Sequence, residues 1–89
     1  MTTHDVKCWP EFFCAIEDGT KPFDLRLNNR NYAIGDVCLF REYDPNKNDY
    51  TGRSIRRLIT YVMEGVGHGA IAPLQGLQRG YCILGLRVE

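Results

Sequence analysis

The stretch that decides the fold is GTKPFDLRLNNRNYAIGDVCLFREY, residues 19–43. From Lys21 the pattern changes to period two: apolar residues occupy every second position of 23–27, and charged residues stand between them. This alternation is typical of a β-strand with one polar face. The sequences NNRN and IGD tolerate turn geometry and lead to a second apolar run at 37–43. The stretch therefore predicts two strands joined by a turn-rich connection.

The residues before this stretch predict one helix that follows a short extended start. In WPEFFCAIEDG, residues 9–19, Pro10 suits the first helical position and Glu11 complements the positive N-terminal end. Gly19 is placed to end the helix. We expect an apolar helix face made of Phe12, Phe13 and Ile16, and we expect Trp9 to belong to the core.

The residues after the stretch predict two more strands. DPNKNDYTG, residues 44–52, is rich in turn-forming residues and predicts the loop of a hairpin whose partner strand is RSIRRLITYVM at 53–63. Residues 64–80 contain five glycines and predict a long connection, which either closes over something or is mobile. The last strand is expected at 81–89. One helix with about five strands predicts an α+β, mainly β fold: a small, strongly curved or closed β-barrel with the helix flanking or plugging it.

Length and composition predict an ordinary globular chain. With 89 residues, 44% of them hydrophobic and 25% charged, we expect a single domain over residues 1–89. Eleven basic and eleven acidic residues give a formal net charge of zero, so any nucleic acid would have to be held by a local basic patch. No apolar run is long enough to span a bilayer and no signal-peptide pattern is present, so we expect a cytoplasmic protein without a membrane partner.

The four cysteines, Cys8, Cys14, Cys38 and Cys82, form no Cys-x-x-Cys pair. In a reducing compartment they are expected to be free thiols that pack as small hydrophobic side chains. A zinc site that combines them with His4 or His68 is the alternative, but the spacing does not favour it. We therefore expect neither a metal nor another cofactor.

Several segments resemble a known family. GTKPFDLRLNNRNYAIGDVCLFREYDP, then YTGRSIRRLITYVM, and finally GLQRGYCILGL are similar, in this order, to small and often phage-encoded uncharacterised domains of the ASCH group in the PUA-like superfamily. The resemblance covers nearly the whole chain. It implies a PUA-like β-barrel, whose relatives bind RNA or modified bases in a cleft beside the helix.

The resemblance also implies site residues. ASCH domains line the cleft with Gly-x-Lys followed by an acidic or hydroxyl residue and an arginine, which correspond here to Gly19, Lys21, Asp24 and Arg26. One bacterial branch removes the acetyl group of N4-acetylcytidine with a lysine, a threonine nucleophile and a glutamate. Lys21 matches the lysine, whereas Asp24 stands in place of the threonine, which changes the nucleophile and the intermediate. Glu64 is the nearest candidate for the glutamate.

Two interpretations of the charged residues stay open from spacing alone. Asp24 and Arg26 alternate onto one strand face with Lys21 nearby, so the three could bind a phosphate and a base amino group. Alternatively, Asp24 only neutralises Arg26, or Arg41 on a neighbouring strand. Arg53 and Arg56 could contact phosphates. Arg57 alternates to the opposite face from Arg56, so one strand cannot present both on one surface.

The favoured hypothesis is an RNA-binding or nucleotide-binding module. Its nucleic-acid contacts would be Lys21, Asp24, Arg26, Arg53 and Arg56. The second hypothesis is an enzyme, either an amidohydrolase on a modified nucleoside or a ribonuclease, with Lys21, Asp24 and Glu64 as catalytic groups. His68 could act as a general base. The third hypothesis is a phage protein that binds a host protein.

Overall fold

A computed structural model describes residues 1–65, 77 and 80–89. Its elements follow the order β1 (Thr3–Cys8), α1 (Pro10–Glu17), β2 (Phe23–Leu27), β3 (Val37–Asp44), β4 (Asp49–Glu64) and β5 (Tyr81–Arg87). The predicted fold class, mainly β with a single short helix, is confirmed. Of the predicted glycine-rich connection at 64–80, Glu64 belongs to β4 instead, and residues 66–76 and 78–79, which include His68, lie outside the described residues.

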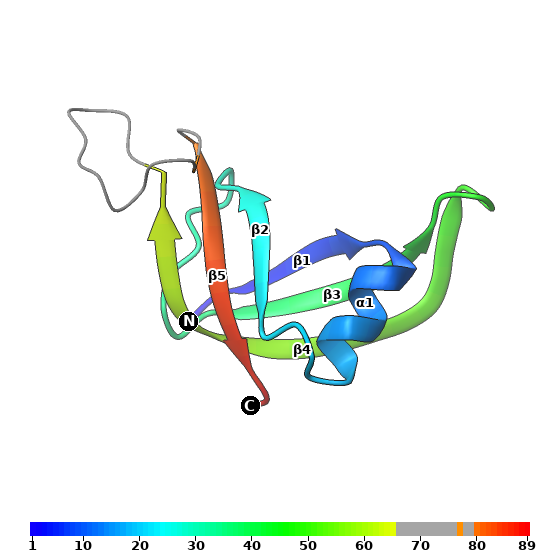
Figure 1. Ribbon diagram of the computed structural model, residues 1–89, viewed down its shortest axis with the longest axis horizontal. Coiled ribbons are helices and arrows are strands. Elements are labelled where there is room, and N and C mark those ends of the chain that lie inside the picture. Colours follow the sequence, from blue (N-terminus) through cyan, green and yellow to red (C-terminus); the bar gives the residue numbers. More distant parts are fainter. Residues whose placement is uncertain (66–76, 78–79) are drawn as a thin grey trace.

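The five strands form one sheet in the order β1-β3-β4-β5-β2, which curls into a half-barrel (Figure 1). Strand β4 produces much of the curl. A straight strand of this length would span about 50 Å at ~3.3 Å per residue, whereas the longest dimension of the molecule is 43 Å. A shift of register between Ile59 and Tyr61 interrupts the pairing of β4. The first part of β4 pairs with β3, and the part near and beyond the shift pairs with β5.

The extended start at residues 3–8 is a full strand, which the sequence prediction did not include as one. Strand β1 pairs in parallel with β3, with His4 opposite Cys38 and Val6 opposite Phe40. Burial alternates along β1, so that His4, Val6 and Cys8 face inward. Two parallel strands need a long crossover connection. Here α1 and β2 both lie within it.

Helix α1 begins and ends where the sequence predicts. Pro10 is its first residue, and Gly19 follows its end with a positive φ of 87°, a conformation that favours glycine. Phe13 and Ile16 are buried against the sheet. Phe12, expected on the apolar face of the helix, and Trp9, expected in the core, are each about half exposed, so the prediction for Trp9 is wrong. An eight-residue helix turns only a narrow stripe toward one sheet face.

The core lies between α1 and the inner face of the sheet. Three of the four cysteines, Cys8, Cys38 and Cys82, belong to it and are free thiols as predicted, whereas Cys14 is exposed. Burial raises the pKa of Cys8 to about 11 and that of Cys38 to about 12. Within residues 1–65, 77 and 80–89 no group of three potential ligands is arranged to hold a metal ion. Nor does that part of the chain contain a helix long and apolar enough to cross a membrane.

Candidate functional site

Strand β2 turns its charged residues inward and its apolar residues outward. Asp24 is only 6% exposed and Arg26 is partly buried, whereas Phe23, Leu25 and Leu27 are about half exposed. Of the pairings expected for Asp24 as a charge neutraliser, that with Arg26 is present, whereas Arg41 pairs with Asp5 instead; Asp24 itself is not on a solvated face. Burying a carboxylate is costly unless it is paired and hydrogen-bonded. Its partners consequently define the site.

Asp24 accepts hydrogen bonds from both cations of the candidate site. The Lys21 ammonium donates to its Oδ1 at 2.9 Å, and the Arg26 Nε donates to its Oδ2. The side chains of Lys21 and Arg26 are 18% and 22% exposed. The sequence prediction that these three residues converge is confirmed. Two cations share one carboxylate, so this largely buried corner carries an excess of one positive charge.

Arg26 also connects the two edge strands of the half-barrel. Its Nη2 donates to the backbone carbonyl of Lys7 on β1 at 2.7 Å, while its guanidinium carbon lies 5.7 Å from the centre of the Phe40 ring. Strands β1 and β2 are the two ends of the sheet order. A side chain of β2 therefore reaches across the opening of the half-barrel to β1.

Half-exposed aromatic rings surround Lys21. Its Nζ lies 5.1 Å from the centre of the Phe12 ring and 5.4 Å from that of Phe23, within the range of cation–π attraction. The sequence analysis missed both rings as site residues. The first belongs to the helix and the second to β2, and no local pattern indicates that the fold brings them to one lysine.

A pocket of about 380 Å³ opens beside Lys21, between the end of α1 and the end of β5. Its lining includes three cations, Lys21, Arg57 and Arg87, and two carboxylates, Glu17 and Asp18. Volumes of this order are common among small-molecule sites. Lys21 thus links the pocket to the buried Asp24.

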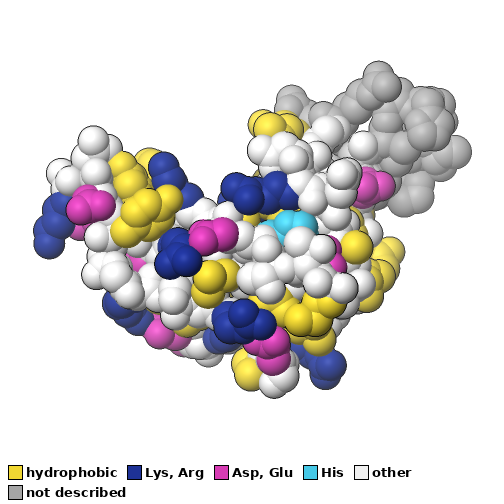
Figure 2. Space-filling model, turned by 180° about the vertical axis from the view of Figure 1, so that it is seen from behind, with side chains coloured by type: hydrophobic (Ala, Val, Ile, Leu, Met, Phe, Trp, Pro, Cys, Tyr) yellow, Lys and Arg dark blue, Asp and Glu magenta, His cyan; other side chains and the backbone are white. Residues whose placement is uncertain are grey.

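A second buried polar pair lies at the start of β1 and β3. His4 Nε2 is 2.8 Å from Asp36 Oδ2, and the ring centroid of His4 is 4.6 Å from that of Tyr32. The hydrogen bond with His4 and that from the backbone amide of Thr2 hold the pKa of Asp36 below its usual value. Figure 2 shows a histidine side chain (cyan) next to basic side chains (dark blue) on one face of the molecule. The alternation along residues 3–8 was the signal that could have placed His4 inside the fold.

Glu64 lies on the same sheet face as Arg26. Glu64 is directly opposite Cys82, which in turn is directly opposite Arg26, and residues directly opposite each other point to the same face. Two interstrand spacings of ~4.8 Å separate their backbones by about 10 Å. The carboxylate of Glu64 accepts a hydrogen bond from the Asn28 side chain at 2.9 Å. The fold therefore places Glu64, the third predicted catalytic residue, in line with Cys82 and Arg26 across strands β4, β5 and β2.

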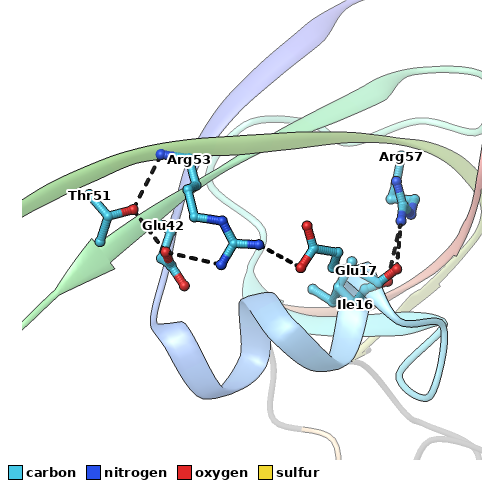
Figure 3. A network of polar contacts seen from close by, with 6 residues as sticks. All are labelled: Ile16, Glu17, Glu42, Thr51, Arg53 and Arg57. Carbon is cyan, nitrogen blue, oxygen red and sulfur yellow. Dashed lines mark hydrogen bonds and ion pairs between the residues drawn. The ribbon is translucent and has the colours of Figure 1, made fainter.

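Arg53 and Arg56 do not join this cluster. Arg53 donates to Glu17 at 2.6 Å and lies 3.6 Å from Glu42, as Figure 3 shows. Arg56 pairs with Glu89 at 2.7 Å. Alternation puts Arg56 on the face of β4 opposite to Arg53, so the two cannot extend one patch. The prediction that both arginines supplement the cleft is not supported by this placement.

Arg57 has a structural task that the sequence did not indicate. Its Nη2 donates to the carbonyl oxygens of Ile16 and Glu17 at 3.4 and 3.3 Å (Figure 3). These carbonyls lie in the last turn of α1, where the negative end of the helix dipole favours a cation. Arg57 therefore stabilises the position of the helix beside the pocket.

Comparison with known proteins gives a family but no activity. No curated protein matches the chain. A family model described as "Domain of unknown function (DUF3850)" matches residues 3–86, which include every strand except the final residue of β5. The chain therefore belongs to the DUF3850 family.

Proposed function

We propose that this protein binds RNA or a nucleotide at the cleft formed by Lys21, Asp24 and Arg26. The observation that carries the proposal is the buried carboxylate shared by two cations. Asp24 uses one hydrogen of Lys21 and one of Arg26. Ammonium and guanidinium groups carry several further N–H donors, and such donors bind phosphate oxygens by charge-assisted hydrogen bonds.

The surroundings of Lys21 supply the other elements of single-strand recognition. Bases stack on exposed aromatic rings with little dependence on sequence. Phe12 offers a half-exposed ring next to a cation, and the pocket beside Lys21 could accept a phosphate or a sugar. The zero net charge of the chain makes this local combination, rather than a global field, the basis of binding.

We further propose that the family is a branch of the ASCH group within the PUA-like superfamily. The order Gly19, Lys21, Asp24, Arg26 matches the ASCH pattern, and the confirmed half-barrel with one helix is compatible with such a fold. Relatives of that group bind RNA or modified bases beside the helix. A modified base is therefore the ligand class to test first.

The test is binding of short single-stranded RNAs, with and without N4-acetylcytidine, followed by fluorescence anisotropy at several salt concentrations. Lys21→Met keeps the apolar stem of the lysine between the rings and removes its charge. We expect a loss of affinity of about tenfold or more, because a hydrogen bond to a charged group contributes ~1.5–3 kcal/mol. The slope of log K against log salt should fall by about 0.7 for each phosphate contact removed.

Arg56→Met is the matched control, since it removes an arginine from the opposite sheet face. It should leave affinity and salt slope unchanged. Equal losses in Lys21→Met and Arg56→Met would show that binding is a general charge effect. An affinity unaffected by Lys21→Met in a protein with an intact circular dichroism spectrum would remove the cleft from the proposal.

An amidohydrolase is the second candidate, and the position of Glu64 favours it. Both carboxylate oxygens of Asp24 accept hydrogen bonds from cations, so Asp24 is better placed to position Lys21 and Arg26 than to act as a nucleophile. In this scheme Glu64 takes a proton from water, the water oxygen bonds to the acetyl carbon, and Lys21 stabilises the resulting oxyanion. The C–N bond then breaks, the proton passes to the leaving amine, and the products are acetate and cytidine.

Mass measurement of the RNA in the same samples separates the candidates. Loss of the acetyl group that Glu64→Gln abolishes, with binding retained, would establish the hydrolase. Cleavage of the strand would indicate a ribonuclease instead. If the RNA neither binds nor changes mass, the nucleic-acid proposal fails, and a host protein becomes the partner to seek.

A further inference from the structure

The outer face of β2, β5 and the end of β4 carries an apolar surface that faces away from the cleft. We call it the outer apolar face. Its residues lie in three rows across the strands, set by the register of pairing. These rows are Phe23 with Gly85 and Tyr61, Leu25 with Ile83 and Met63, and Leu27 with Tyr81.

Most of this face is exposed. Six of its side chains are between 38% and 56% exposed: Phe23, Leu25, Leu27, Tyr61, Met63 and Tyr81. With about 200 Å² for each whole side chain, they leave roughly 500 Å² accessible. The largest apolar patch on a monomer is typically about 300–600 Å² and is often functional. A patch of this size on a chain of 89 residues therefore indicates a surface that binds a partner.

The three rows contain no charged residue among the positions that the structure describes. The nearest cation along β5 is Arg87, which follows the row of Phe23 and Gly85 at the end of the strand. The central row consists of Leu25, Ile83 and Met63, all of them apolar. In the row of Phe23, Gly85 has no side chain, and Tyr61 packs beside it: a Cβ at Gly85 would lie 3.2 Å from the Cβ of Tyr61. The face therefore has an apolar centre.

We propose that the outer apolar face is the interface of a homodimer, with a second copy of this chain as its occupant. An interface of standard size buries about 800 Å² per partner, of which about 56–65% is apolar. The roughly 500 Å² of apolar area exposed on the outer apolar face is close to the apolar part of such an interface. An uncharged face can pack on its own copy without like-charge repulsion, and the zero net charge of the chain adds no repulsion between copies.

This arrangement leaves both clefts open. Residues of β2 alternate between the two faces of the sheet. The side chains that pack against the partner are therefore Phe23, Leu25 and Leu27. Asp24 and Arg26 point into the half-barrel instead. A dimer would hold two clefts on opposite sides of the interface. The proposal does not depend on what the clefts bind.

The experiment is sedimentation velocity of the full chain over a range from micromolar to near-millimolar concentration. We expect the dimer mass for the natural sequence, and a shift to monomer in Leu25→Arg that raises the dimer dissociation constant by at least tenfold. Ile34→Arg is the matched control. Ile34 is also an exposed apolar residue, 64% accessible, but it belongs to the connection before β3 and not to the outer apolar face.

Circular dichroism confirms that each variant is folded before its mass is interpreted. A natural chain that stays monomeric across the range overturns the proposal and would assign the face to a different protein. A dimer that Leu25→Arg and Ile34→Arg disturb equally, or not at all, overturns it as well, because the interface would lie elsewhere.

Discussion

Replacing Asp24 by asparagine tests whether the shared carboxylate holds the opening of the half-barrel together. Asp24→Asn keeps the shape of the side chain but removes the charge that Lys21 and Arg26 both contact. Each charge-assisted hydrogen bond contributes ~1.5–3 kcal/mol when buried. The two cations are about one-fifth exposed, so water partly replaces the lost partner. We therefore expect the free energy of unfolding to fall by about 2–3 kcal/mol.

Urea denaturation followed by far-ultraviolet circular dichroism measures this loss. With an m-value of about 1 kcal/mol per molar urea, the midpoint should fall by roughly 2–3 M. Asp5→Asn is the control, since Asp5 pairs with Arg41 on neighbouring strands through side chains that are about half exposed. Its effect should stay below about 1 kcal/mol. Equal shifts in the two variants would refute the reasoning that burial makes the Asp24 pairs stronger.

Three further predictions concern other parts of the fold. The pKa of Asp36 is lowered in the folded state, mainly by its hydrogen bond with His4. The ionised Asp36 should therefore stabilise the fold at neutral pH, and this contribution should disappear as the pH falls below about 4. The stability difference between the natural chain and Asp36→Asn, measured by urea denaturation, should shrink over the same pH range. Gly85→Ala should lower stability by about 1 kcal/mol, because the added Cβ would lie 3.1 Å from a side-chain oxygen and 3.2 Å from a Cβ on β4; a thermal melt as high as that of the natural chain would contradict this. A thiol reagent should modify Cys14 in the folded protein and reach the three buried cysteines only in denaturant, with the number of labelled sites counted by mass.

Local patterns predicted much of the fold because they depend on neighbouring residues. Pro10 and Gly19 mark the ends of α1, and the turn-rich residues before β4 mark a hairpin, although its turn is limited to 45–48 because both strands extend further than predicted. The convergence of Lys21, Asp24 and Arg26 could also be predicted, since it needs only the alternation of one strand and the segment before it.

The remaining features depend on contacts between distant segments. Alternation shows that β2 has two different faces but not which of them is buried, and here the curled sheet encloses the charged face, where Asp24 pairs with two cations. Parallel pairing turns residues 3–8 into β1, and the register of β4 with β5 brings Glu64 to the row of Arg26. The sequence by itself determined where the helix and most strands lie and which charges cluster. Only the tertiary structure decided which side of each strand is enclosed, because that choice depends on the packing and pairing of residues far apart in the chain.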